Sequence, residues 1–351
     1  MAFGIYVHWP FCEKKCPYCD FNSHVAKTSV DQALYVRAFE REMQHYRSRT
    51  GKRLINSIFF GGGTPSLMEV GTVGHLLELM AKYWDFDSEI EITLEANPSS
   101  VEADRFKGYR LAGVNRLSLG IQALDDAALQ ALGRLHNTKE ALTALEIAEK
   151  SFPRFSFDLI YARPHQTVQS WEEELKIALC YARDHISLYQ LPIEEGTHFS
   201  ALYKAGKLKL PDNEIAAQLY EITDMITAQH GLPAYEISNY AAKGNESKHN
   251  LIYWRYQEYI GLGPGAHSRF LQSSKNAQRT ALINEKIPRK WLQLLSEAEH
   301  AIVEEEAVSA EQQAEELILM GLRLEEGVNF SDYTMLKGEK FPIMRVKALQ
   351  E

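Results

Sequence analysis

The sequence predicts an α/β fold, an incomplete (β/α)6 barrel of the TIM type with a small additional part at its C-terminal end. The first observation is a series of short β-rich runs, at Gly4–His8, Ile55–Phe60, Ile90–Glu95, Asn115–Ile121, Phe155–Tyr161 and Ile186–Leu191. The second is the helical periodicity of intervening segments, at Asp31–Tyr46, Ser66–Tyr83, Thr138–Lys150 and Val168–Arg183. Strands that alternate with helices favour a parallel sheet covered by crossover helices.

Local signals at the starts of helices support this interpretation. Thr64-Pro65 places a proline in a first helical turn, and Asn97-Pro98-Ser99 offers a capping side chain. Asp125-Asp126 places two acids at a helix N-terminus, where negative side chains interact favourably with the unpaired backbone N–H groups. These positions fit the expected βα order.

The rhythm changes after Leu191, and we expect three parts. They are a barrel core at 1–200, a barrel-closing segment rich in glycine and aromatic residues at 201–270, and a small, mainly helical or α/β domain at 271–351. Helical patterns near Pro211–Gln229 and Glu311–Leu324 support the later parts. Because no closing element follows Phe341-Pro342-Ile343, we expect the chain to be truncated.

Composition and charge exclude several classes of protein. The apolar share of 45% suffices for a buried core, and the net charge of −9 argues against a nucleic-acid partner. The first residues lack a secretory signal, and no run of about 18 apolar residues predicts a membrane span. We expect a cytoplasmic protein, with peripheral contact to a membrane left open.

Three of the four cysteines lie within eight residues, directly after the first predicted strand. Cys12, Cys16 and Cys19 have the spacing Cys-x3-Cys-x2-Cys, which favours a metal site over a disulfide framework. Three thiolates leave one coordination position open on an iron–sulfur cluster, whereas a structural zinc site would need a fourth ligand, such as His8 or His24. Cys180 has no partner nearby, and we expect a small buried side chain.

The cysteine spacing, with Tyr18 before the third cysteine, resembles the signature of the radical SAM superfamily. The resemblance implies a [4Fe–4S] cluster on Cys12, Cys16 and Cys19 and S-adenosylmethionine on the fourth iron. It also implies that reductive cleavage of S-adenosylmethionine yields a 5′-deoxyadenosyl radical.

Further motifs follow in the order of that superfamily, at the carboxyl ends of the expected strands, where barrel sites lie. By resemblance, the residues that contact S-adenosylmethionine are Tyr6, Tyr18, Gly62, Gly63, Thr64, Glu95, Gln122, Arg134, Asp158 and Ala266. Taken singly, the glycines could serve a tight turn, Glu95 could be a solvated acid and Tyr6 a core residue. One motif departs from the family: Ala162-Arg163-Pro164-His165 replaces Gly-Leu-Pro-Gly, which leaves the geometry of that loop in doubt.

Two features separate the branches that resemble oxygen-independent coproporphyrinogen III oxidase and the haem-trafficking HemW group. The oxidase continues as Cys-x-Cys and has a long segment before the cluster loop, whereas this chain has Cys19-Asp20-Phe21 and reaches Cys12 after eleven residues. His249-Asn250-Leu251-Ile252-Tyr253-Trp254 resembles the His-Asn-x-x-Tyr-Trp motif of the HemW branch. The competing interpretation is a packed aromatic strand with a surface histidine.

The resemblance implies a haem chaperone, in which His249 binds haem and the haem passes to an acceptor protein of unknown identity. An imidazole can ligate haem iron, and Tyr253 and Trp254 offer flat apolar faces to a porphyrin. In this interpretation no residue is catalytic. The alternative is an oxygen-independent coproporphyrinogen III oxidase, an enzyme of porphyrin metabolism.

Overall fold

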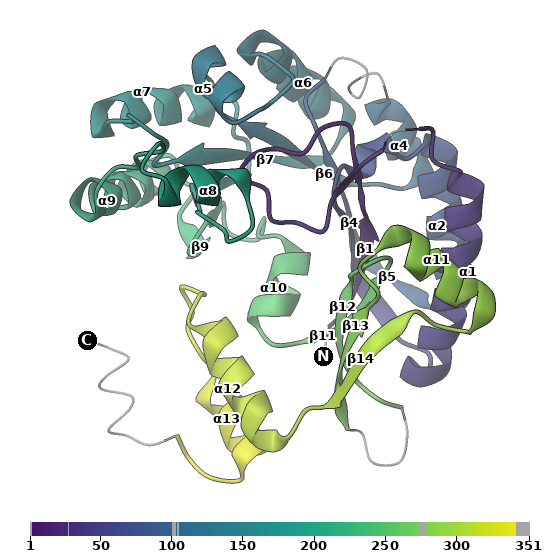
Figure 1. The fold of residues 1–351 in the computed structure, drawn as a ribbon. Coiled ribbons are helices and arrows are strands. Elements are labelled where there is room, and N and C mark those ends of the chain that lie inside the picture. Colours follow the sequence, from purple (N-terminus) through teal and green to yellow (C-terminus); the bar gives the residue numbers. More distant parts are fainter. Residues whose placement is uncertain (1, 27, 100–102, 104, 274–277, 342–351) are drawn as a thin grey trace.

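The computed structural model describes residues 2–26, 28–99, 103, 105–273 and 278–341. A 12-stranded sheet dominates it (Figure 1). Its parallel part contains, in spatial order, β11 (Glu258–Leu262), β1 (Phe3–Trp9), β4 (Leu54–Gly62), β5 (Asp85–Ala96), β6 (Arg116–Gln122), β7 (Arg154–Tyr161) and β8 (His185–Gln190). Antiparallel strands extend both ends: β12 (His267–Leu271), β13 (Arg279–Asn284) and β14 (Ile302–Ala307) beyond β11, and β10 (Asn239–Ala241) and β9 (Ala234–Glu236) beyond β8.

The incomplete barrel expected from the sequence is confirmed. The six predicted strands are β1, β4, β5, β6, β7 and β8, paired in chain order. The sheet curves but does not close, because its two edge strands, β14 and β9, do not pair with each other (Figure 1). Strand β11 adds a seventh parallel strand beside β1, in a stretch for which no strand was predicted.

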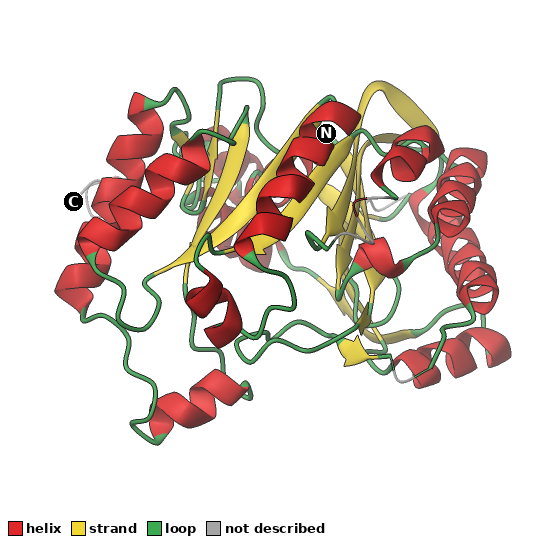
Figure 2. Cartoon of the chain, turned by 90° about the horizontal axis from the view of Figure 1, so that it is seen from above, coloured by secondary structure: helices red, strands yellow, loops and turns green. Residues whose placement is uncertain are grey.

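Helices cover the outer side of the parallel sheet, and from above the strands lie in the middle of the molecule (Figure 2). They are α1 (Gln32–Thr50), α2 (Val70–Tyr83), α4 (Phe106–Ala112), α5 (Asp126–Ala131), α6 (Thr138–Ser151), α7 (Val168–Leu179) and α9 (Asn213–Gln229), with a short 3-10 turn, η1 (Pro65–Leu67). Helix α8 (His198–Lys204) lies instead against the loop after β1, where the Phe199 N–H donates to the Pro17 carbonyl at 2.9 Å. Pro65 opens η1, and Asp125 caps α5 by accepting from the Ala128 N–H at 2.7 Å, both as predicted. The cap expected at Asn97-Pro98-Ser99 adjoins residues outside the described range.

The parallel strands separate an apolar outer layer from a polar interior. On β1, Ile5 and Val7 are fully buried in the same cluster as Phe39 of α1, whereas Tyr6 and His8 point to the interior. Burying an aliphatic side chain of this kind stabilises the fold by roughly 1.5–3 kcal/mol. The same alternation along the neighbouring strands leaves polar side chains to line the barrel.

After residue 262 the chain extends the sheet and then forms helices. Strands β13 and β14 belong to the main sheet, α11 (Pro288–Glu297) packs near α1, and α12 (Ala310–Gly321) packs on α13 (Phe330–Lys337). The region after residue 271 is thus partly β, and the division into three domains stays a prediction. Residues 342–351, where we expected truncation, lie outside the described range. In the described part of the chain, no helix is long and apolar enough to cross a membrane.

Candidate functional site: a cysteine loop at one end of the barrel and a buried histidine at the other

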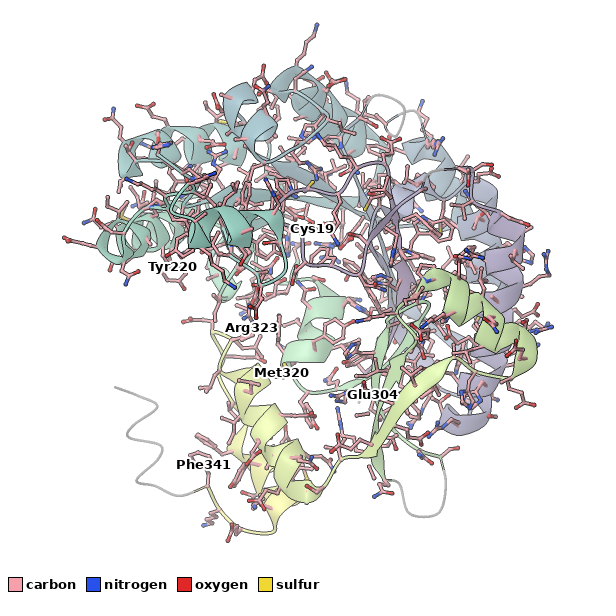
Figure 3. The ribbon with its side chains drawn as sticks, in the orientation of Figure 1. Cys19, Tyr220, Glu304, Met320, Arg323 and Phe341 are labelled. Atoms are coloured by element: carbon pink, nitrogen blue, oxygen red, sulfur yellow. The ribbon has the colours of Figure 1, made fainter. Side chains whose placement is uncertain are left out.

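The cysteine loop follows β1 and is closed at its base by two short parallel strands, β2 (Phe11–Cys12) and β3 (His24–Val25). The His24 N–H donates to the Pro10 carbonyl at 2.7 Å, and the Ala26 N–H donates to Cys12 at 3.1 Å. Cys12 is buried, while Cys16 and Cys19 are half-buried. The base is therefore fixed, and the second and third thiols lie on the part of the loop that projects over the barrel (Figure 3, where Cys19 is labelled).

The glycine-rich segment at the end of β4 holds this loop from below. The Gly63 N–H donates to the Trp9 carbonyl at 2.7 Å, and the Thr64 N–H donates to Phe11 at 2.8 Å. A Cβ atom on Gly63 would lie 2.6 Å from the Phe11 carbonyl oxygen, a distance that a side chain cannot adopt. The glycine is therefore required for the close approach of two backbones, and the ligand contact expected for this motif stays a prediction.

Asn22 ties the loop to the far end of the sheet, and sequence reasoning missed it. Its Nδ2 donates to the carbonyls of Pro264 and Lys286, both at 2.9 Å, and its own carbonyl is hydrogen-bonded to His8 Nε2 at 2.9 Å. The separations of 242 and 264 residues explain why no local pattern pointed to it. Asn22 therefore holds the cysteine loop against the segments that follow β11 and β13.

Arg134 brings a positive charge to the cysteine loop. Its Nη1 donates to Cys16 Sγ at 3.6 Å, and its Nη2 donates to the Gly120 carbonyl at 2.7 Å and to Asn97 Oδ1 at 2.5 Å. Tyr18 lies beside it, and burial raises the pKa of that phenol. The guanidinium of Arg134 therefore contacts one of the three thiols predicted to bind the cluster.

Gln122 ends β6 with a positive φ of 74°, a conformation that a residue with a side chain rarely adopts. Such backbone strain is concentrated at functional sites. A Cβ atom on the neighbouring Gly120 would lie 3.1 Å from Gln122 Nε2 and 3.3 Å from Arg134 Nη2. The strand end therefore gathers the polar groups of Gln122, Arg134 and Asn97, of which only Asn97 was not predicted as a site residue.

Two carboxyl groups lie deeper in the barrel. Burial, together with the nearby Asp158, raises the pKa of Glu95 from 4.5 to about 8 although Glu95 accepts from the Gly62 N–H at 3.3 Å. Burial also raises the pKa of Asp158, from 3.8 to about 6, and a hydrogen bond from Ser187 opposes that rise. The pair is able to hold or release protons near neutral pH, as polar groups in a ligand site do.

The remaining predicted contacts lie on or beside β1. Tyr6 OH is hydrogen-bonded to His8 Nδ1 at 3.0 Å inside the barrel, so Tyr6 is not part of the outer core. Ala266 is buried in the turn between β11 and β12, where its N–H donates to the Gly263 carbonyl at 3.2 Å. Tyr6 therefore faces the interior, and Ala266 lies in the turn at the carboxyl end of β11.

The loop after β7 departs from the family pattern at two positions that have a left-handed backbone. Ala162 has a φ of 54° and His165 a φ of 63°, so both adopt the conformation that glycine adopts most easily. Between them, the buried guanidinium of Arg163 pairs with the carboxylate of Glu174. The loop keeps the turn that glycines would allow, at the cost of backbone strain.

The zinc alternative finds no support in the arrangement of side chains. Among the described residues, no three His, Cys, Asp or Glu side chains lie close enough to hold one metal ion. His8 is hydrogen-bonded through both ring nitrogens, to Tyr6 and Asn22, and His24 Nε2 is hydrogen-bonded to Asn22 Oδ1 at 3.2 Å. In a cluster each thiolate binds a different iron, so the three thiols need not converge on one point.

His249 lies on α10 (Lys248–Trp254), a helix that fills the opening between β11 and β9 (Figure 1). The side chain is 1% exposed, which differs from the surface histidine on a strand that we considered as the competing interpretation. Its Nδ1 is hydrogen-bonded to Ser57 Oγ at 2.7 Å, and its Nε2 to Tyr253 OH at 2.9 Å. Burial lowers the pKa of His249 to about 3, so the imidazole is neutral.

Aromatic rings surround this imidazole. Phe59 stacks on it with ring centroids 5.1 Å apart, and Tyr253 meets it edge-on at 4.8 Å. Tyr253 in turn packs edge-on against Tyr259 at 4.5 Å. A neutral imidazole among flat rings is the chemistry that haem binding needs.

The histidine lies far from the cysteine loop along the strands. Its partner Ser57 is level with Gly4 in the register of β1 and β4, whereas Trp9 and Gly62 are level with the start of the loop. At about 3.3 Å per residue, these two levels are roughly 16 Å apart. The predicted residues therefore lie at two levels of the parallel strands, and Tyr6, whose ring centroid is 6.3 Å from that of His249, lies between these levels.

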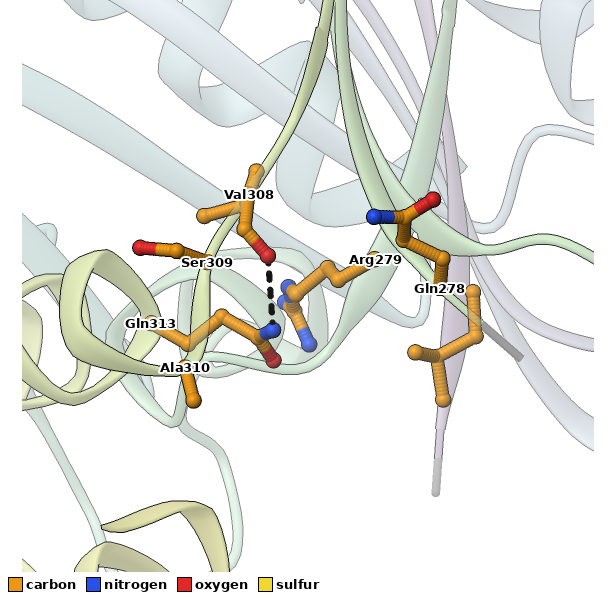
Figure 4. Close-up of a pocket in the computed structure, with 7 residues that line it drawn as sticks. Gln278, Arg279, Val308, Ser309, Ala310 and Gln313 are labelled. Carbon is orange, nitrogen blue, oxygen red and sulfur yellow. Dashed lines mark hydrogen bonds between the residues drawn. The ribbon is translucent and has the colours of Figure 1, made fainter. Parts of the chain in front are cut away.

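Two other features involve none of the predicted site residues. A cavity of about 400 Å³ opens between β13 and α12 (Figure 4), and its lining residues are Leu271, Gln278, Arg279, Val308, Ser309, Ala310 and Gln313. None of them was predicted as a site residue. Cys180, expected to be buried, is exposed, and its thiol donates to the Lys176 carbonyl at 3.3 Å. It lies at the end of α7, where the helix is shorter than predicted.

Comparison with known proteins decides the family. The model of the "Radical SAM superfamily" matches residues 6–178. "Heme chaperone HemW" of Haemophilus influenzae is 38% identical over 95% of this chain and 86% of its own length. The corresponding protein of Bacillus subtilis is 37% identical over 92% of this chain and 84% of its own length. The chain belongs to the HemW-type family of the radical SAM superfamily.

Relatives with another name occur in the same family. "Radical S-adenosyl methionine domain-containing protein 1, mitochondrial" of Bos taurus is 41% identical over 93% of this chain and 74% of its own length. Among solved structures, coproporphyrinogen III oxidase (HemN) from Escherichia coli, described as a radical SAM enzyme, has a TM-score of 0.79 at 23% identity, over 95% of this chain and 78% of its own. That likeness concerns the fold alone.

Proposed function

We propose that this protein is a haem chaperone that binds haem through His249 and passes it to an acceptor protein. The observation that carries the proposal is the imidazole on α10, kept neutral by burial and enclosed by Phe59, Tyr253 and Tyr259. A neutral imidazole has the lone pair that an axial iron ligand needs. Relatives named haem chaperones, among them those of Haemophilus influenzae and Bacillus subtilis, support the same conclusion.

We also propose that the cysteine loop holds a [4Fe–4S] cluster on Cys12, Cys16 and Cys19, with S-adenosylmethionine on the open iron. The donors fit: three free thiols on one loop, and a guanidinium that donates to Cys16. When bound, the cluster and S-adenosylmethionine supply one-electron chemistry. The radical SAM superfamily, to which the chain belongs, uses this pair of cofactors.

The chain's own residues would position S-adenosylmethionine. In this proposal, Gly62 and Gly63 present backbone groups beneath the cysteine loop, since no side chain fits at these two positions, and Thr64 follows them. Glu95 accepts hydrogen bonds from the ribose hydroxyls, and Gln122 and Arg134 complete the polar rim of the site. Tyr6, Tyr18, Asp158 and Ala266 remain further predicted contacts.

A haem titration tests the main proposal. Ferric haem added to purified protein should give a saturable Soret band at one haem per chain, and His249→Ala should weaken binding at least tenfold, or about 1.4 kcal/mol. His267→Ala, which removes an exposed histidine outside the motif, should leave binding unchanged. Equal binding by wild type and His249→Ala would show that another residue ligates the iron.

The second candidate is an oxygen-independent coproporphyrinogen III oxidase, favoured by the polar barrel interior directly beneath the cysteine loop. Reconstituted protein with reductant, S-adenosylmethionine and coproporphyrinogen III distinguishes the two. The chaperone proposal predicts no divinyl product, whereas sustained turnover would replace it with the oxidase. Phe21, where the oxidase pattern has a cysteine, is the residue that argues against turnover.

A cytoplasmic location is also part of this proposal, although a relative in the same family is named as mitochondrial. Peripheral contact with a membrane would bring the protein to acceptors there.

A further inference from the structure

Every polar group of the proposed haem ligand is engaged within the protein. Ser57 and Tyr253 occupy the two ring nitrogens of His249, and its backbone N–H donates to Glu91 Oε1 at 3.3 Å. With only 1% of the side chain exposed, neither nitrogen can approach an iron atom that lies outside the barrel. The helix that carries His249 must therefore move before a planar macrocycle can reach it.

On its inner side, α10 is seated against the barrel by close packing and by ions. The side chain of Ile252 and the His249 ring lie over Gly4, where an added Cβ would be 3.1 Å from Ile252 Cδ1 and 3.4 Å from His249 Cε1. Arg154, which pairs with Glu91 at 2.6 Å, donates to the backbone carbonyls of residues 245 and 246, just before the helix. Because Gly4 has no side chain, α10 can pack closely against β1.

On its outer side, α10 is held by residues 323–326, a segment that follows α12. Arg255, directly after the helix, forms a bidentate ion pair with Glu326 at 2.6 and 2.8 Å. The guanidinium of Arg323 lies 4.3 Å from the centre of the Trp254 ring (Arg323 is labelled in Figure 3), and its Nη2 donates to Glu236 Oε2 at 3.0 Å. This segment thus binds the last residue of the motif and the residue after it.

The same segment is fixed to the edge of the sheet. The Ile237 N–H donates to the Arg323 carbonyl at 3.2 Å, and the Glu325 N–H donates to the Tyr235 carbonyl at 3.1 Å. Residues 323–326 therefore bridge β9 and α10. The contacts with α10 are solvent-accessible side-chain pairs, which are individually weak and easily exchanged.

We propose that this structure is the closed state of the haem site, in which α10 masks His249, and that residues 323–326 are a latch that holds α10 closed. The inference rests on the proposed function, because it takes His249 as the haem ligand. Haem binds when the latch releases and α10 turns His249, Tyr253 and Trp254 away from the barrel. An acceptor that displaced the latch would thereby control haem loading and release.

Two variants should open the site from opposite sides. Glu326→Arg replaces the latch ion pair with repulsion against Arg255, and Gly4→Ala introduces a methyl group beneath Ile252 and His249. Only the open protein binds haem, so the apparent affinity is proportional to the fraction of protein that is open. Each variant raises that fraction and should tighten haem binding roughly threefold to fivefold. Glu311→Arg, which breaks the ion pair with Lys337 elsewhere on α12, is the matched control and should change nothing.

Hydrogen exchange gives a readout that does not depend on haem spectra. Backbone amides of residues 249–254 should exchange faster in Glu326→Arg and Gly4→Ala than in wild type, and haem should accelerate their exchange in all three. Thermal unfolding checks that each variant is folded. Glu326 is exposed, so its replacement should leave the melting temperature close to that of wild type.

The outcomes separate this inference from the function on which it rests. If His249→Ala abolishes haem binding but both opening variants keep the wild-type affinity and exchange, the latch is wrong and the haem-ligand proposal stands. If haem binding survives in His249→Ala, the ligand assignment and the masked site both fail. The latch is supported if both opening variants bind haem more tightly and exchange faster than wild type while Glu311→Arg behaves as wild type.

Discussion

The two ends of the barrel differ in how their side chains are presented. At the carboxyl end of the strands, Gln122 and Arg134 already surround the loop with the three cysteines, and the backbone approaches closely because glycines leave room. At the other end, His249 has both nitrogens occupied by Ser57 and Tyr253 and is covered by its own helix. One scaffold therefore carries polar groups that are already assembled around the cysteine loop, and a histidine whose ring nitrogens are both covered.

The difference has a physical cause. Strand ends and loops in an α/β barrel leave polar groups directed at a common space, so a ligand site there needs little rearrangement. A histidine on a helix packed into the barrel must instead satisfy its polar atoms internally, because an unpaired buried nitrogen costs about 1–3 kcal/mol. In the proposed function, haem binding would have to offset that cost when the iron replaces the internal partners of His249.

Loss of a cluster ligand should have the largest effect and should be confined to one end. Cys16→Ala removes the thiol that Arg134 contacts, so anaerobic reconstitution should yield no iron–sulfur absorption, whereas haem should bind as in wild type. Cys180→Ala, at an exposed thiol, should behave as wild type in both assays. Loss of haem binding together with the cluster would contradict the separation of the two ends.

Loss of the buried carboxylate of Glu91, beneath α10, should destabilise the end of the barrel that carries His249. Glu91 is buried, pairs with Arg154 at 2.6 Å and lies 4.0 Å from the buried Arg116, so Glu91→Ala leaves a buried cation uncompensated. We expect a loss of about 3 kcal/mol in the free energy of unfolding, measured by urea titration. Glu305→Ala, which breaks the pair of an exposed carboxylate with the half-buried Arg49, should cost less than about 1 kcal/mol. Equal losses would mean that Glu91 does not support α10.

Protonation of Glu95, near the cysteine loop, should make the stability of the protein depend on pH. Since burial and Asp158 raise the pKa of Glu95 from 4.5 to about 8, the folded state keeps a proton that the unfolded chain releases between these values. The free energy of unfolding should therefore fall as the pH rises through that window, by up to about 1.4 kcal/mol per pH unit. Glu95→Gln should flatten this dependence, and Glu149→Gln, on the outer surface of α6, should not. An unchanged slope in Glu95→Gln would assign the effect to another group.

The smallest expected effect lies in the loop after β7. His165 is exposed and has a left-handed backbone, so His165→Gly should raise the free energy of unfolding by about 0.5–1 kcal/mol. Gly196→Ala makes the reverse change at a φ of 82°, with no atom near the added methyl, and should lower it by about 1 kcal/mol. Cluster content should be unchanged in both. A destabilised His165→Gly would mean that the histidine makes a contact that offsets its strain.

The sequence predicted the barrel well because its strands alternate between an apolar outer face and a polar inner face. The six central strands and their pairing order follow from that period. Strand β11 was missed, since it is short and lies in a glycine-rich stretch. Helix α10 was missed because it has only seven residues and contains Asn, Tyr and Trp, which favour helices weakly.

The candidate site was predictable where function depends on local motifs. The cysteine spacing and the glycine-rich segment are read within a few residues, and the structure brings them together. Asn22, Ser57 and Glu91 were not predicted, because their partners are 158 to 264 residues away in the chain. Burial of His249 arises from packing between α10, β1 and β4, which no local pattern encodes.

Identification of the axial ligand in the haem-bound protein tests the central claim most directly. Electron paramagnetic resonance of the ferric haem complex should show imidazole ligation, which His249→Ala removes and Cys16→Ala leaves intact. A thiolate signature that is lost in Cys16→Ala and retained in His249→Ala would place haem on the cysteine loop and contradict two separate sites.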